Sequence, residues 1–377
     1  MQGSLVDVRK VENDFTLGKV KLRRLDFPSG KSLKEPVQAY AAFGKLSEAK
    51  DNVILVCHAL TGSHLVTGEK VEGLPEPWWK DMVGPGKALD TSRYCVICFN
   101  VLGSPYGSTS PISINPDTQR PYAMEFPVLS VRDLVYAQRK ALDQLGIKRL
   151  KAVVGGSLGG MQALEWAVSF PEMVERAVVI AAPAHLYPQA IALNEVQRQA
   201  IYSDPKWKGG NYTPDDPPRK GLSVARMLAM ITYRSEQCFS KRWMRKIQDG
   251  NPMDWSGRFC VESYLHYHGE EIVRRFDANC YIYLTRTMDL HDVGAGRGGT
   301  QEALSRFSGK DLLAVGITSD MLFPNWQVEE ISFLASKAGV RACYDEIESD
   351  DGHDAFLTDQ NQLDDIIRSF WKKTNLN

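Results

Sequence analysis

A serine flanked by glycines is the first feature of this chain that could do chemistry. The motif Gly155-x-Ser157-x-Gly159 follows a β-branched run and precedes a helix-forming stretch. A sharp strand-to-helix turn holds such a serine in a strained conformation, and the two glycines remove Cβ atoms that would clash. The pattern predicts a nucleophilic Ser157, with the Leu158 N–H at a helix N-terminus as an oxyanion donor. A plain glycine-rich turn or a phosphate loop is the alternative, and the strand and helix context disfavours it.

An acid and a base follow in the chain order that one class of Ser-His-Asp enzymes uses. Asp320 comes after one strand-like run and His353 after the next, so both lie at the carboxyl ends of strands, the functional edge of a parallel sheet. Taken alone, Asp320 could cap the helix that follows it, and a lone loop histidine is usually a surface residue. Order and strand context together predict a Ser157–His353–Asp320 triad. Asp350 and Asp351 precede the histidine, but no strand places them as its partners.

A second oxyanion donor is expected in an early loop. The segment His58-Ala59-Leu60-Thr61-Gly62 follows an apolar run, in the position where related enzymes carry a His-Gly motif. Alanine replaces the first glycine, and the expected donor is the Leu60 backbone N–H. His58 could be mistaken for a base, but His353 already occupies that place, so we interpret His58 as a structural loop residue.

The elements that must position these residues are short strands alternating with helices. Apolar residues recur at helical spacing over Ser130–Leu145. This alternation predicts an α/β fold with a mostly parallel, doubly wound sheet. The predicted buried strands are Val53–Cys57, Tyr94–Asn100, Leu150–Gly155, Ala177–Ala182, Leu312–Ile317 and Ala342–Ile347.

The strand pattern breaks between about His185 and Thr300. Apolar residues there follow helical periods, no strand run stands out, and a Pro/Gly-rich stretch at 206–218 interrupts. We therefore predict a helical lid over the active face. The expected organisation is a first core segment at 1–184, a lid insertion at 185–300 and a second core segment at 301–377.

Composition excludes several other classes of protein. The 377 residues are 43% hydrophobic and 24% charged, with a formal net charge of −1, so no electrostatic attraction to nucleic acid or an anionic membrane is expected. No apolar run is long enough to span a bilayer, and residues 1–15 lack the apolar core of a secretory signal. Seven scattered cysteines without paired CxxC motifs predict no metal site, no disulfide framework and a cytoplasmic location.

With these motifs in place, the chain resembles the homoserine O-acetyltransferases of methionine biosynthesis, acyltransferases with the α/β-hydrolase fold, over nearly its whole length. Generic esterases would share the serine motif and the triad, but not the matching blocks in the lid region. The matching blocks are His58–Gly62, Gly84–Thr91, Asn100–Ser104, Ser113–Pro116, Gly155–Trp166, Ala225–Leu228, Thr232–Ser235, Phe276–Asn279 and Asp351–Asp354.

The resemblance implies a two-step transfer with acetyl-CoA as co-substrate and no bound cofactor. Ser157 would take the acetyl group, with the oxyanion on the Leu60 and Leu158 amides. His353 would then deprotonate the hydroxyl of L-homoserine, while Asp320 orients the imidazole. The family also implies a homodimer formed through the lid helices.

The family's substrate-binding positions map onto Arg226 for the carboxylate of homoserine and Asp354 for its ammonium, with Tyr233 nearby. A zwitterion needs one charge of each sign, and a guanidinium grips a carboxylate in bidentate fashion. Without the resemblance, Arg226 would more readily be interpreted as a surface ion-pair residue. Arg234 is left as structural.

Four alternatives stay open from sequence. The same fold could use succinyl-CoA, or serine as the acceptor, although the apolar Leu322 near the expected acyl pocket offers no cation for a succinyl carboxylate. A secondary-metabolite acetyltransferase with a larger alcohol acceptor, a plain esterase and a non-enzymatic binding module are the others. An intact Ser-His-Asp set disfavours the last.

Overall fold

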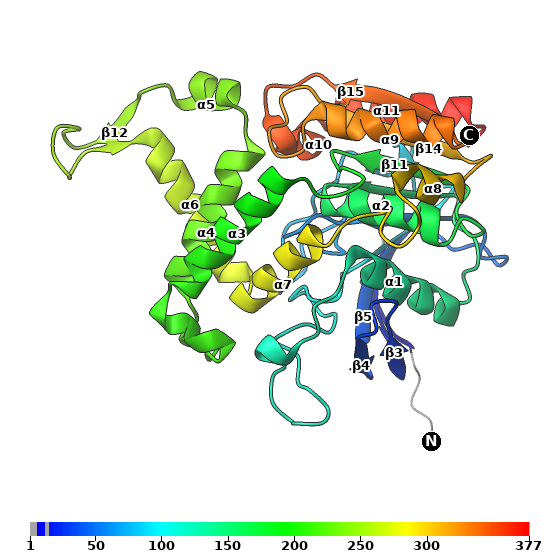
Figure 1. The fold of residues 1–377 in the computed structure, drawn as a ribbon, viewed down its shortest axis with the longest axis horizontal. Coiled ribbons are helices and arrows are strands. Elements are labelled where there is room, and N and C mark those ends of the chain that lie inside the picture. Colours follow the sequence, from blue (N-terminus) through cyan, green and yellow to red (C-terminus); the bar gives the residue numbers. More distant parts are fainter. Residues whose placement is uncertain (1–5, 12–14, 377) are drawn as a thin grey trace.

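A nine-stranded sheet forms the centre of the computed structural model, which describes residues 6–11 and 15–376 (Figure 1). The first residues of the predicted segment 1–184 lie outside the described part. The sheet order is β1-β2-β5-β9-β6-β10-β11-β14-β15. Its strands are β1 (Val6–Val11), β2 (Phe15–Lys21), β5 (Val37–Phe43), β6 (Val53–Cys57), β9 (Cys95–Phe99), β10 (Ala152–Gly156), β11 (Arg176–Ile180), β14 (Asp311–Ile317) and β15 (Arg341–Ile347).

The six strands from β9 to β15 in this order run parallel, which confirms the predicted fold class. All six predicted runs are strands of this parallel part. The expectation that Ala342–Ile347 is buried is wrong, because β15 is the last strand of the sheet and only its Ile347 is buried. The sequence did not predict β1, β2 and β5, which pair antiparallel at one edge of the sheet. β2 lies between β1 and β5, and its burial largely alternates between buried and more exposed positions, because a strand in an antiparallel part of a sheet can have one face in water. It therefore has no continuous apolar run to reveal it.

Helices cover both faces of the sheet, as a doubly wound fold requires. Val53, Leu55 and Cys57 of β6 point into one core, together with α1, α2 and α9. Ile54 and Val56 point into the other, together with α11. These helices are α1 (Val131–Leu145), α2 (Leu158–Ser169), α9 (Asn325–Lys337) and α11 (Gln360–Lys373), joined by the short α8 (Thr300–Ser305) and α10 (Ala355–Thr358).

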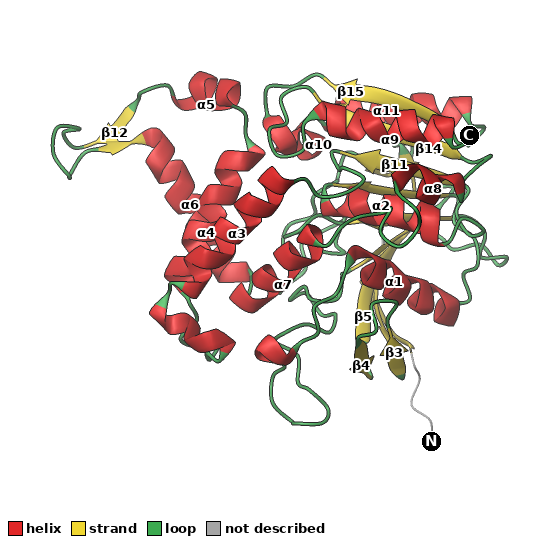
Figure 2. Ribbon diagram, viewed as in Figure 1, coloured by secondary structure: helices red, strands yellow, loops and turns green. Residues whose placement is uncertain are grey.

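A second, mainly helical body lies between β11 and β14 in the chain and stands beside the carboxyl ends of the strands (Figures 1 and 2). The sequence pattern missed a small hairpin in it, because its strands are only three and two residues long and mostly exposed. Its elements are α3 (Pro188–Tyr202), α4 (Arg219–Tyr233), α5 (Glu236–Trp243), β12 (Ile247–Asp249), β13 (Arg258–Phe259), α6 (Cys260–Arg275) and α7 (Ala278–Asp289). We call α3 to α7 with this hairpin the lid.

Smaller elements complete the core. They are the hairpin β3 (Arg24–Asp26) and β4 (Ser32–Lys34), and the pair β7 (Val83–Gly84) and β8 (Leu89–Asp90). Among the described residues, no helix has the length and apolar character that crossing a membrane demands.

Candidate active site

Ser157 occupies the turn between β10 and α2 in a strained backbone conformation. Its φ is 58° and its ψ is −127°, a region that costs a non-glycine residue free energy and persists only where the surroundings hold it. The Ser157 N–H donates to the Ile180 carbonyl at 2.9 Å, and the Ser157 carbonyl accepts from the Met161 N–H at 3.0 Å. The turn therefore presents the side chain above the sheet, as the sequence motif predicts.

The glycines on either side of Ser157 are required by close backbone approach. A Cβ at Gly155 would lie 2.2 Å from the Gly159 carbonyl oxygen, and one at Gly159 would lie 2.0 Å from the Cys57 carbonyl oxygen. Both contacts are with backbone atoms, which cannot give way as a side chain could. The spacing of the two glycines is therefore required by the close packing of β10, α2 and the end of β6.

The structure brings Ser157, His353 and Asp320 into one hydrogen-bonded chain. His353 Nε2 lies 2.8 Å from Ser157 Oγ, and His353 Nδ1 lies 2.6 Å from Asp320 Oδ2. All three residues are buried, with exposed fractions of 6%, 3% and 6% respectively. Asp320 does not cap α9, since its second oxygen accepts from the Leu322 and Phe323 amides at 2.8 and 2.9 Å.

Burial and charge act in opposite directions on His353. Burial disfavours the imidazolium, but the charge and hydrogen bond of Asp320, joined by the charge of Asp354, outweigh it and raise the pKa of His353 above its usual value. This geometry is the one that an orienting acid requires. A carboxylate at Nδ1 holds the Nδ1–H tautomer, so that Nε2 faces the serine, and in a triad of this kind it also stabilises the imidazolium.

The two amides of the predicted oxyanion hole lie on separate loops. Leu158 is the first residue of α2, where an N–H has no intrahelical acceptor. Leu60 follows Ala59 in a turn closed by the Gly62 N–H, which donates to the Ala59 carbonyl at 3.0 Å.

His58 supports this turn and has no nitrogen left for use as a base. Its Nε2 accepts from the Val101 N–H at 3.0 Å, so the proton is on Nδ1, which donates to the Ala59 carbonyl at 2.8 Å. Burial lowers the pKa of His58 to about 4, which keeps the ring neutral.

The predicted substrate residues surround His353 on the lid side. The Arg226 guanidinium lies 5.4 Å from the centre of the Tyr233 ring, and that ring lies 5.8 Å from the centre of the His353 ring. Within the described part of the chain, Arg226 forms no ion pair, in contrast to the surface ion pair that sequence alone would favour. Burial raises the pKa of Asp354, against the opposing charges of Arg234, Arg226 and His353. A partly buried carboxyl group thus lies next to the histidine in the chain, and an unpaired cation lies one ring away from it, across Tyr233.

Arg234, which the sequence pattern leaves as structural, holds the histidine loop. Its guanidinium lies 3.2 Å from Asp351 and 3.4 Å from Asp354, the residues two before and one after His353. The neighbouring Cys238 Sγ donates to Asp351 at 3.2 Å. These contacts occupy Asp351, so that this acid does not compete with Asp320 for His353. The sequence shows acids on both sides of His353 and an arginine next to Tyr233, and these residues could have suggested the contact. The two segments are 117 or more residues apart, however, and nothing in the sequence indicates that they pair.

The histidine loop has further contacts with the N-cap and the last turn of α5 (Glu236–Trp243). Ser235 Oγ donates to the Asp350 carbonyl, and Lys241 pairs with the Asp350 carboxylate. The lid therefore contacts His353 through Tyr233 and holds the loop that carries this histidine.

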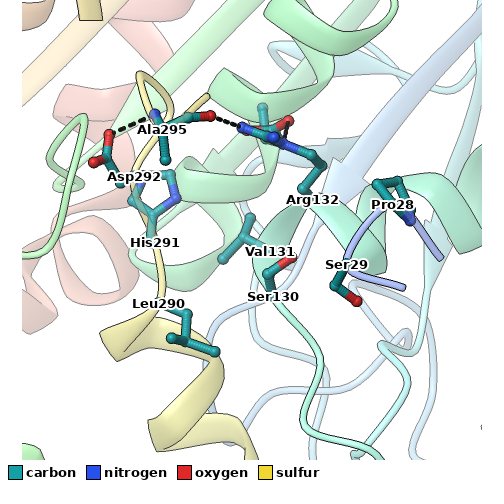
Figure 3. A pocket seen from close by; sticks show the side chains of 10 residues that line it. Pro28, Ser29, Ser130, Val131, Arg132, Leu290, His291, Asp292 and Ala295 are labelled. Atoms are coloured by element: carbon teal, nitrogen blue, oxygen red, sulfur yellow. Dashed lines mark hydrogen bonds and ion pairs between the residues drawn. The ribbon is translucent and has the colours of Figure 1, made fainter. Parts of the chain in front are cut away.

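A separate cavity of about 190 Å³ lies at the start of α1 and contains no residue of the triad (Figure 3). Its charged groups are already paired. Arg132 donates to the Ala295 carbonyl at 2.9 Å and to Glu165 at 3.2 Å. His291 Nε2 lies 3.1 Å from the Pro183 carbonyl oxygen. We interpret this cavity as a packing junction.

The sheet, the strained serine and the hydrogen-bonded triad define an α/β hydrolase, and the family model for the alpha/beta hydrolase fold matches residues 52–360. A homoserine O-acetyltransferase of Symbiobacterium thermophilum is 51% identical to this chain, over 91% of this chain and 90% of its own. The crystal structure of homoserine O-acetyltransferase from Bacillus anthracis superimposes with a TM-score of 0.88 at 31% identity, over 95% of this chain and 98% of its own. The crystal structure of esterase E22 has a TM-score of 0.87 at 28% identity, over 97% and 99%.

The chain thus belongs to the homoserine O-acetyltransferase family within the α/β hydrolases. This confirms the family resemblance that the sequence blocks indicate.

Proposed function

We propose that this chain transfers an acetyl group from acetyl-CoA to the hydroxyl of L-homoserine in methionine biosynthesis, through an acetyl-Ser157 intermediate. The observation that carries the proposal is the pair of opposite charges beside the base. Any esterase needs the triad, whereas an unpaired Arg226 and a partly buried Asp354 next to His353 suit a zwitterionic acceptor. The high identity to relatives named for this activity supports it.

The first half-reaction makes the acetyl-enzyme. His353 Nε2 takes the Ser157 proton across their 2.8 Å hydrogen bond as Oγ attacks the thioester carbonyl. The developing oxyanion is stabilised by the Leu60 and Leu158 amides. When the tetrahedral intermediate collapses, the C–S bond breaks, and the coenzyme A sulfur takes the proton from the imidazolium.

The second half-reaction uses the same groups in reverse. Arg226 holds the carboxylate of homoserine and Asp354 its ammonium, which places the hydroxyl near His353. His353 removes the hydroxyl proton, the oxygen attacks the acetyl carbonyl, and Ser157 leaves with that proton. The lid limits access of water, so a bound hydroxyl has the advantage over hydrolysis.

An acetyl donor suits the acyl side of the site better than a succinyl donor. Leu322 and Phe323 are buried and apolar, and their amides are engaged by Asp320. A second carboxylate would need a cation there, and these side chains offer none.

The second candidate is an acetyl esterase, which the likeness to esterase E22 favours. An esterase would use water in the second half-reaction, so the acceptor separates the two functions. Coenzyme A release should be measured with acetyl-CoA or succinyl-CoA against homoserine, serine and water. We expect rapid release only with acetyl-CoA and homoserine, in a ping-pong pattern with parallel double-reciprocal plots. Equal turnover with and without homoserine would support the esterase, and intersecting plots would indicate direct transfer.

The nucleophile is tested by Ser157→Ala, which should abolish coenzyme A release and leave the fold intact. Mass spectrometry of the wild type with acetyl-CoA alone should show one acetyl group on the peptide that carries Ser157. An unmodified peptide, together with continued turnover in the variant, would exclude Ser157.

A homodimer through the lid and a cytoplasmic location complete the proposal. Large apolar side chains are exposed on the lid, among them Val224 on α4, Tyr267 on α6 and Trp255 at the tip of the hairpin, and a second copy would cover them. All seven cysteines are free thiols, which suits a reducing compartment.

A further inference from the structure

The loop that carries the Leu60 amide is held at three of its carbonyl oxygens. The His58 carbonyl accepts from Gln162 Nε2 of α2 at 3.3 Å. The Ala59 carbonyl accepts from the Gly62 N–H and from His58 Nδ1. The Thr61 carbonyl accepts from Arg275 Nη1 at 2.8 Å. The first two anchors belong to the core, whereas Arg275 is the last residue of lid helix α6.

These anchors set the direction of the Leu60 N–H. The Ala59 carbonyl and the Leu60 N–H belong to one planar trans peptide and point in opposite directions. Holding the Ala59 carbonyl therefore aims the amide away from its two donors. The Thr61 carbonyl shares one peptide with the Gly62 N–H, so holding this carbonyl fixes one of the two donors to the Ala59 carbonyl. An oxyanion hole depends on such pre-positioning, because a misdirected donor must reorganise during the reaction.

Arg275 donates its hydrogen bonds to uncharged oxygen acceptors. The same Nη1 also donates to the Tyr106 hydroxyl at 2.8 Å. In the residues that the structure describes, Arg275 has no carboxylate partner, while the adjacent Arg274 is exposed and pairs with Glu270 and Glu271. Because Tyr106 is buried, water has little access to replace its hydroxyl as an acceptor for Arg275. Unlike Arg274, Arg275 therefore does not belong to a surface ion pair of the lid.

We propose that Arg275 is a positioning residue through which the lid completes the oxyanion hole. It touches neither substrate nor reacting atoms, and acts by holding the Thr61–Gly62 peptide, whose N–H in turn holds the Ala59 carbonyl of the peptide that carries the Leu60 amide. The inference rests on the proposed function only in that Ser157 chemistry passes through a tetrahedral oxyanion, whichever acceptor is used. Because the same amide serves both tetrahedral intermediates, loss of Arg275 should slow acylation and deacylation alike.

The test compares Arg275→Gln with Arg274→Gln, a matched control one residue away. Rapid mixing gives the rate of coenzyme A thiol release from acetyl-CoA, and decay of the acetyl-enzyme with homoserine gives the second step. Removing an oxyanion donor outright costs about 10²–10³-fold, so displacing one should cost about tenfold or more in each step. The KM for acetyl-CoA should stay near wild type, and Arg274→Gln should match wild type throughout.

Inhibition by an alkylboronic acid, which forms a tetrahedral adduct on serine, is a second measurement. The inhibition constant would not change if Arg275 had only a structural role. This constant should rise in Arg275→Gln by about the same factor as the rates fall. Arg275→Lys keeps the charge but not the reach of the guanidinium, so its losses should be intermediate. Tyr106→Phe, which leaves the Thr61 bond in place, should show a smaller loss in the same two steps.

Wild-type rates and wild-type boronate affinity in Arg275→Gln would overturn the proposal. A raised KM for acetyl-CoA with unchanged rates would also overturn it, because Arg275 would then be a contact for coenzyme A. If Arg275→Gln does not fold, Arg275→Lys decides, and wild-type behaviour there overturns the proposal. A chromogenic acetate ester separates this test from the proposed function. If homoserine is not the acceptor, Arg275→Gln should still slow hydrolysis of the ester relative to Arg274→Gln.

Discussion

At the scale of single residues, the site is built from groups whose neighbours push them toward one protonation state. His58 is kept neutral by burial, with a pKa of about 4. His353, equally buried, has a raised pKa because Asp320 and Asp354 lie beside it. Two histidines in one site are thus separated into a loop support and a base by the carboxylates near one of them.

Asp320→Asn should lower turnover by on the order of 10⁴-fold, with little loss of stability. The asparagine oxygen can still accept from the Leu322 and Phe323 amides, but its NH₂ would face Nδ1 and favour the wrong tautomer of His353. Activity requires neutral His353, so it is lost as pH falls through the pKa of that histidine. Since Asp320 raises this pKa, the residual activity of the variant should persist to lower pH than that of the wild type. A pH profile of the acylation rate checks both effects. Near-wild-type activity would mean that another acid serves as partner.

Arg226→Ala should separate the two half-reactions. The homoserine carboxylate would lose its charged partner, which is worth roughly 3–5 kcal/mol in buried pairs, so the KM for homoserine should rise strongly. Acetyl-enzyme formation should change little, because the donor is not a zwitterion. Asp354→Ala should show the same separation, although its contact with Arg234 also affects the histidine loop.

Arg219→Ala, an exposed arginine on the same helix, is the control and should behave as wild type. Equal losses in both half-reactions for Arg226→Ala would show that the arginine holds the lid or binds coenzyme A. The acceptor would then be unassigned.

At the scale of elements, the loop between β15 and α10 is held in place by α5 and the two residues that precede it. Arg234, Ser235, Cys238 and Lys241 all contact residues 350–354. The base therefore sits at a contact between lid and core, and lid packing is coupled to the alignment of the triad.

Gly352→Ala tests this contact. Gly352 has a φ of +70°, and a Cβ there would lie 2.7 Å from the Ser235 nitrogen and 2.8 Å from the Arg234 backbone. Gly30→Ala is a matched control, with a φ of +79° and nothing within 4 Å of the added Cβ. Both variants bear the left-handed strain of about 1–2 kcal/mol, but only Gly352→Ala should also displace the histidine loop and lose most of its activity. Thermal unfolding and turnover measure the two effects, and equal activity in both variants would exclude coupling through this contact.

At the scale of the whole molecule, the lid has apolar surface that the core does not cover. Val224 and Ile231 lie seven residues apart on α4 and are 52% and 42% exposed, so they share one outward face. This face is where we expect the second subunit.

Val224→Glu should shift the protein from dimer to monomer in sedimentation experiments, because a charge would be buried in an apolar contact. Phe333→Glu on α9, where the original side chain is 56% exposed, is the control on the core and should leave the assembly unchanged. A monomeric wild type, or an unaltered dimer in Val224→Glu, would contradict the proposed interface.

The parallel sheet and the chain positions of the triad residues could be predicted from sequence, because both follow from local patterns. Continuous apolar runs mark the buried strands β10 and β14, which Ser157 and Asp320 follow. His353 follows β15 in the expected order, although only Ile347 of that strand is buried. The same logic placed Leu60 and Leu158 after β6 and β10. The missed strands include β2, β5 and those of the lid hairpin. β2 alternates in burial and the hairpin strands are only three and two residues long, so they have no such run, whereas β5 is mostly buried and was missed although its residues 39–43 are apolar.

Only the tertiary structure decided which residues hold the site together. Arg234 reaches Asp351 and Asp354 across 117 and 120 positions of the chain, and Arg275 reaches Thr61 across 214. Such contacts leave no periodic trace, because they depend on how the lid packs against the core and not on the local pattern of either. For the same reason, Arg226 and Arg234 could not be told apart by sequence pattern. One is unpaired and the other is bound to the histidine loop, and this difference exists only in the folded chain.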